Sequence, residues 1–115
     1  MEIRPQEAAR KLMENAKKIE EMTEKIIEAR TDATMAEAVY LDAKREAWKA
    51  TRSESATAAQ QIISYTTTDE KKALSLAECG LKNLQDRLRV LDTANNNFKM
   101  AIKLMELEIK NLNLQ

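Results

Sequence analysis

Residues 74–112 decide the fold: LSLAECGLKNLQDRLRVLDTANNNFKMAIKLMELEIKNL. Apolar residues recur here at alternating steps of three and four, the spacing that keeps one face of an α-helix against a partner helix. The phase holds through the following positions: Leu74, Ala77, Leu81, Leu84, Leu88, Leu91, Asn95, Phe98, Ile102, Met105, Ile109 and Leu112. We therefore predict a coiled-coil helix over about residues 68–113.

One member of this seam is polar, Asn95, and it belongs to a run of three asparagines. Asparagine is a poor helix former, so the run is also compatible with a turn between two shorter helices. The heptad phase passes through the run unbroken, which favours one continuous helix. Asn95 would then be a buried polar layer that sets register or oligomeric state at a cost in stability.

A second seam precedes this one in the chain. Pro5 suits the first turn of a helix and is followed by strong helix formers, so we expect a helix over about residues 5–62. Its seam is mostly alanine: Met22, Ile26, Ala29, Ala33, Ala36, Tyr40, Ala43, Ala47 and Ala50. Thr34 and Glu37 have the spacing of a capping box, which allows a break near residues 31–34.

A β-branched run separates the two helices: Ile62, Ile63, Thr66, Thr67 and Thr68. Because such residues lower helix propensity, we expect the main turn at about residues 63–68. Thr67 and Glu70 then offer a cap for the second helix. The predicted fold class is all-α: a long antiparallel helical hairpin or coiled coil, one domain over residues 1–115.

Apolar residues outside the seams predict self-association. Leu41, Trp48 and Ile62 share a heptad position on the first helix, and further apolar residues flank the second seam: Leu76, Val90, Leu104 and Leu107. A two-helix hairpin leaves these residues without a partner, and copies of the same chain would supply one as an oligomeric bundle. The residues expected to hold the oligomer are Leu81, Leu84, Leu88, Leu91, Asn95, Phe98 and Ile102.

Composition excludes several function classes. One Gly, one Pro and 33% charged residues in 115 are typical of long helices, and the chain has no His. It also has no glycine-rich phosphate loop and no Cys pair, so we expect no enzyme and no cofactor. Glu20, Glu21 and Glu24 are interpreted as a solvated face, not a metal site, and Cys79 as an inert or surface thiol.

Targeting signals are also missing from the sequence. The opening MEIRPQEAARKLMENAKK has no apolar core of a signal peptide, and no stretch reaches membrane-spanning length. We therefore expect a cytoplasmic protein without a membrane partner. The net charge of zero gives no general attraction to nucleic acid, so any such binding must come from local clusters.

One such cluster surrounds the only Trp, in KREAWKATR at residues 44–52. At about 100° per residue, Trp48 points away from the alanine seam, together with Lys44, Arg45 and Arg52. With Lys49, these residues could form a stacking platform for single-stranded nucleic acid. The alternative is that Trp48 packs on a neighbouring subunit while the cations extend around it.

A basic stripe runs along one position of the second helix. Its cations include Lys82, Arg89 and Lys103, spaced at heptad intervals. The stripe is a candidate phosphate track, and salt bridges to acids on a facing helix are the competing interpretation.

The chain resembles the UvsY recombination mediators of tailed phages and, more loosely, other small phage-encoded helical-hairpin proteins. The resemblance rests on the amphipathic opening QEAARKLMENAKK, the basic-aromatic AKREAWKATR and the later LRVLDTANNNFKMAIKLMELEIKNL. It implies an oligomer in the bacterial host cytoplasm that binds single-stranded DNA, a recombinase and a single-strand-binding protein. By position, its DNA-contacting residues would be Lys44, Arg45, Lys49 and Arg52.

Two functions therefore remain open. The first is a non-enzymatic, mediator-like accessory of phage recombination or replication that holds single-stranded DNA on Trp48 and its neighbouring cations. The second is a structural or adaptor coiled coil, such as a virion chaperone or scaffold, with protein partners only. Phosphate contacts would weaken steeply with salt, whereas adaptor binding would respond little.

Overall fold

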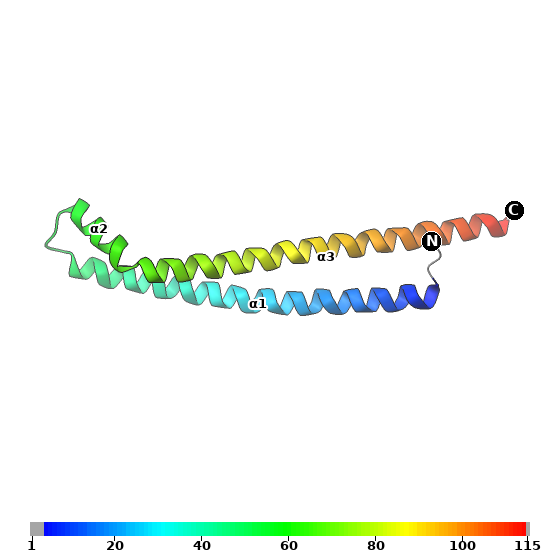
Figure 1. Ribbon diagram of the computed structural model, residues 1–115, viewed down its shortest axis with the longest axis horizontal. Coiled ribbons are helices and arrows are strands. Elements are labelled where there is room, and N and C mark those ends of the chain that lie inside the picture. The colour runs from blue at the N-terminus through cyan, green and yellow to red at the C-terminus, as the bar shows by residue number, and fades with distance from the viewer. Residues whose placement is uncertain (1–3, 115) are drawn as a thin grey trace. The chain divides into compact units, whose positions relative to one another are not determined.

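The computed structural model describes residues 4–114, and the side chains of residues 4–113. Residues 1–3 and 115 of the predicted domain lie outside the described part. The elements in chain order are α1 (Pro5–Ala50), α2 (Ala56–Thr66) and α3 (Thr68–Leu114), as Figure 1 shows. The described residues form helices and no strand, which confirms the predicted all-α helical hairpin.

Packing divides the chain into two compact units. The first combines residues up to Lys25 with residues from Leu84 onward, and the second spans Ile26–Asn83. In each unit a segment of α1 lies beside a segment of α3 that runs in the opposite direction (Figure 1). The second unit also contains α2.

The start and course of α1 follow the sequence. The helix begins at Pro5, as predicted, because proline lacks only a donor that the first turn does not use. No break occurs at residues 31–34. Instead, the hydroxyls of Thr31 and Thr34 donate to the carbonyls of Ile27 and Arg30, so both threonines are accommodated inside the helix.

The end of α1 was predicted wrongly: the helix stops at Ala50 and not near residue 62. Thr51 is buried, and its hydroxyl donates to the carbonyls of Ala47 and Trp48, which have no helical partner at this end. Four residues later the Ser55 hydroxyl accepts from the backbone N–H of Ala58 and caps α2. The connection between α1 and α2 is therefore residues 51–55.

The β-branched run is mainly helical, in contrast to the predicted turn at 63–68. The hydroxyls of Thr66, Thr67 and Thr68 each donate to the carbonyl four residues earlier. Only Thr67 leaves helical geometry, at φ −106° and ψ 15°, and it separates α2 from α3. Back-bonding of this kind bends a helix without ending the chain's helical course.

Both predicted seams are the inward faces of their helices, because seam residues are buried or half-buried with few exceptions. Ala50 is exposed where α1 ends, and Ile109 and Leu112 are exposed near the end of α3. On α1 the same spacing also continues upstream of Met22, through Ala8, Leu12, Asn15 and Ile19.

A polar pair interrupts the seam of the first unit. Asn95 is only 6% exposed, and its Oδ1 accepts a hydrogen bond of 3.0 Å from Nδ2 of half-buried Asn15. The predicted buried polar layer and the predicted continuity of α3 through the asparagine run are both confirmed. The bond joins two helices of one chain and fixes their register, since a shift of either would leave the Asn95 amide unsatisfied.

The hydrophobic interior is thin. Among the described side chains, the buried apolar residues are Ala8, Ile26 and Ala59, and none of them is large and completely enclosed. Two helices can shield only one stripe of each other, so most large apolar side chains stay partly in water.

Candidate functional site

The most prominent surface features are two rows of exposed apolar side chains, one on each long helix. The α1 stripe consists of Met13, Ile27 and Leu41, and the α3 stripe of Leu76, Val90 and Leu104. Within each row the residues are fourteen apart, which is two heptads and therefore one helix face. Their exposure runs from 50% at Leu41 to 74% at Met13 and Leu76.

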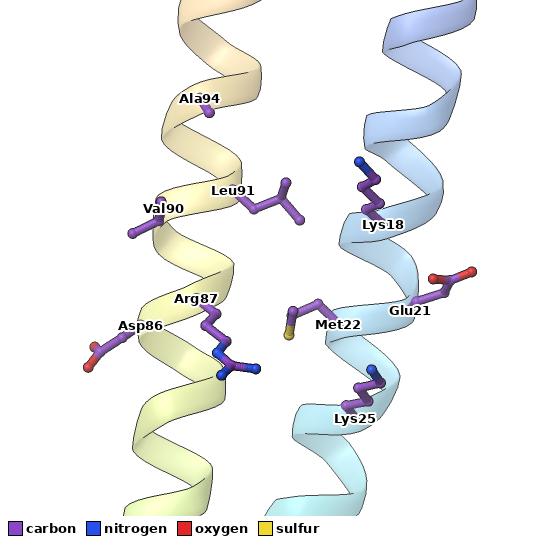
Figure 2. Close-up of a pocket in the computed structure, with 9 residues that line it drawn as sticks. All are labelled: Lys18, Glu21, Met22, Lys25, Asp86, Arg87, Val90, Leu91 and Ala94. Carbon is purple, nitrogen blue, oxygen red and sulfur yellow. The ribbon is translucent and has the colours of Figure 1, made fainter.

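A groove of about 590 Å³ opens beside the α3 stripe in the first unit. Figure 2 shows Met22 of α1 and Leu91 of α3 projecting toward each other across it. Val90 and Ala94 line its α3 side. The remaining lining residues are charged: Lys18, Glu21, Lys25, Asp86 and Arg87. The groove thus has an apolar floor and a rim on which cations outnumber acids.

The residues predicted to hold an oligomer lie instead on the inward face of α3. Asn95 bonds to α1 of the same chain, and the others share its face. Leu81, Leu84, Leu88, Leu91, Phe98 and Ile102 are half-buried. Intra-chain packing therefore accounts for this set, while the exposed stripes have no such cover.

Trp48 lies near the end of α1 and is 56% exposed, in agreement with its predicted outward direction. The nearest printed partner of a neighbouring cation is another ring: Nζ of Lys44 lies 5.3 Å from the centroid of Tyr40. Such a cation–π contact at an exposed site contributes about 0.5–1 kcal/mol. Lys44 is therefore held one turn before Trp48, with its charge still at the surface.

Three of the nominated cations pair with acids of their own helix. Arg45 lies 3.4 Å from Asp42, Lys49 lies 3.5 Å from Glu46, and Arg89 lies 3.8 Å from Asp86. All these side chains are more than half exposed, so each pair contributes about 0–1 kcal/mol. The pairs lower the local positive charge but are weak enough for a phosphate to displace.

The other nominated cations are Arg52, in the connection after α1, and Lys82 and Lys103, on α3. All three are exposed and form no ion pair within the described residues. Arg52 follows Trp48 by four residues, so Lys44, Trp48 and Arg52 lie on one short stretch of the second unit. Lys82 belongs to the second unit, and Arg89 and Lys103 belong to the first.

Other site classes leave little trace in the described residues. There, no three His, Cys, Asp or Glu side chains gather as a metal site would require. Cys79 is exposed, as predicted for its heptad position. None of the three helices, over the part described, contains a stretch long and apolar enough to cross a membrane.

Sequence reasoning missed two functional features. Asn15 was not recognised as the partner of Asn95, although the three-four spacing of Ala8, Leu12, Asn15 and Ile19 carried the signal. The fourteen-residue spacing of Met13 and Ile27 with Leu41 was also readable and was missed.

The chain was also compared with known proteins. No protein-family model, curated protein or solved structure matches it.

Proposed function

We propose that this protein is a non-enzymatic helical-hairpin module that acts by assembling with copies of itself and presenting the assembly to protein partners. One observation carries the proposal: the large apolar side chains of the described residues are mostly outside. Only Ala8, Ile26 and Ala59 are buried apolar residues, whereas both stripes and many further large side chains are exposed. Exposed apolar rows of this kind mark interaction surfaces.

Surface area gives the size of the missing contact. The chain exposes 9512 Å². A compact monomer of 13.1 kDa is expected to expose about 6,400 Å². The excess of about 3,000 Å² is in the range that stable oligomers bury. The net charge of zero means that approaching copies do not repel each other strongly.

Native mass measurement tests the proposal directly. We expect the purified chain, at micromolar concentration, to sediment as a discrete multiple of 13.1 kDa in both low and high salt. Assembly driven by apolar burial resists salt, whereas assembly driven by surface charge does not. A single species at the monomer mass in both buffers would refute it.

A second candidate function is the mediator-like binding of single-stranded DNA, with a recombinase or single-strand-binding protein as further partner. It is favoured by exposed Trp48 between Lys44 and Arg52, since a base can stack on the indole while the cations meet phosphates. Base stacking of this kind contributes about 1–3 kcal/mol per base. The resemblance to the UvsY mediators points the same way and stays a prediction.

Fluorescence of the sole tryptophan tests this candidate. Oligo-dT should quench Trp48 at low salt, and the affinity should fall steeply as salt rises. Exchanging Lys44 and Arg52 for Glu should abolish the quenching, whereas the same charge change at exposed Lys11 and Lys17, distant in sequence, should not. Absence of both quenching and a gel shift at low salt would remove DNA binding from consideration.

A further inference from the structure

We propose that copies of this chain join through a defined pairing: the α1 stripe of one copy packs antiparallel against the α3 stripe of the next. This inference rests on the self-assembly proposed above and specifies its interface. The stripes are Met13, Ile27 and Leu41 on α1, and Leu76, Val90 and Leu104 on α3. Each stripe lies along one uninterrupted helix and so belongs to that helix alone.

Matched spacing supports the pairing. If Ile27 lies opposite Val90 of a second copy, then an antiparallel arrangement places Met13 opposite Leu104 and Leu41 opposite Leu76. All three apolar contacts form in a single register because both rows repeat every fourteen residues. Between them, the same register places Ala16 opposite Ala101, a pair small enough for close helix approach.

Polar layers alternate with the apolar ones in the same register. Glu20 falls opposite Asn97, and Thr34 falls opposite Asn83. A shift by one heptad would place every stripe residue against one of these polar positions. Alternation therefore specifies the register, as isolated polar positions do in coiled coils.

Charge complementarity appears where the neighbouring α1 would cover the groove. Val90 and Ala94 line that groove, and its rim carries three cations against two acids. The α1 segment placed over it in this register, residues 20–27, carries three acids, Glu20, Glu21 and Glu24, against one cation, Lys25. Opposite net charges on the two surfaces favour this occupant and its orientation.

One position opposes the pairing and makes it sharper to test. The register places Arg30 opposite Arg87 of the second copy, and like charges that face each other lower the affinity. Both side chains are exposed and long enough to turn outward. Replacing Arg30 by Glu should therefore tighten the assembly, an outcome that no other alignment of the stripes predicts.

The two stripes lie on different sides of the hairpin. Val90 shares the groove with Lys18 and Lys25 of α1, and Met13 lies at least about 120° around α1 from both lysines. Each copy then uses one surface to bind a predecessor and another to bind a successor. Such a heterologous contact builds a closed ring or an open filament, not a two-fold dimer.

Cross-linking between different copies tests the pairing. In a Cys79→Ser background, I27C protein is mixed with V90C protein, dissociated, reassembled and then oxidised. We expect a disulfide dimer in the mixture and little in either protein alone. The matched control pairs I27C with N97C, which is displaced by one heptad or about 10 Å along the helix. The control should give at most a trace.

Stripe substitutions test the energetics. Val90→Glu should raise the subunit dissociation constant at least about tenfold. Met100→Glu, at an equally exposed apolar position outside the stripes, should change it little. In the same assay Arg30→Glu should lower the dissociation constant.

The outcomes separate this inference from the proposed assembly. An oligomeric mass with no I27C–V90C bridge, or with efficient V90C–V90C bridges, would overturn the pairing and leave self-assembly standing. A monomeric mass for the unmodified chain would end both.

Discussion

Breaking the Asn15–Asn95 hydrogen bond should destabilise the first unit in a way that a mutant cycle can isolate. Asn95 is 6% exposed and accepts from Asn15 at 3.0 Å. Asn15→Ala leaves the Asn95 oxygen buried without its protein donor, which costs about 1–3 kcal/mol. Asn95→Ala removes the buried group itself, and half-buried Asn15 can then turn its amide to water. The bond's own net contribution is about 0.5–1.5 kcal/mol.

The cycle compares Asn15→Ala, Asn95→Ala and the double variant by urea unfolding, followed by circular dichroism at one protein concentration because assembly changes apparent stability. We expect the double variant to lose less than the sum of the singles by about 1 kcal/mol or more. Strictly additive losses would refute the claim that this bond couples the helices. The Asn15→Leu, Asn95→Leu pair is the matched control, and it should be more stable than the original because an apolar layer replaces a polar one.

Three further predictions concern single sites. Gly80→Ala should raise the melting temperature, by about 0.5–1 kcal/mol of stability, because α3 is helical there and nothing lies within 4 Å of an added Cβ; an unchanged or lower melting temperature would show that something approaches this position closely. Ser55→Ala should cost about 0.5–2 kcal/mol by removing the cap of α2, whereas Ser53→Ala in the same connection should cost little. Arg45→Ala should change stability by less than about 0.5 kcal/mol because its ion pair with Asp42 is exposed, and a larger loss in thermal melts would contradict that assignment.

Periodicity made the two long helices predictable. The three-four spacing around Leu88 and Leu91 holds over the whole of α3, and it outweighed the poor helix propensity of the asparagine run. The same reasoning placed Trp48 outside and Asn95 inside, because angle around a helix depends only on position in the chain.

The connection between the helices was harder to predict because local propensity gave the wrong answer. Threonines 66–68 looked like a turn, yet their hydroxyls bond to carbonyls of the preceding turn and keep the backbone nearly helical. The actual connection, residues 51–55, depends on the burial of Thr51 against the rest of the unit. Propensity carries no information on that contact.

The sequence alone therefore determined the helical class, the inward face of each long helix and the outward direction of Trp48, because all three follow from a repeat of 3.5–3.6 residues. Tertiary structure decided where α1 ends, which residue satisfies Asn95, and that the predicted oligomer seam of α3 is covered by α1 of the same chain. These outcomes depend on which helix face meets which partner. A heptad pattern shows that a partner is needed, but only the packed chain shows which one is there.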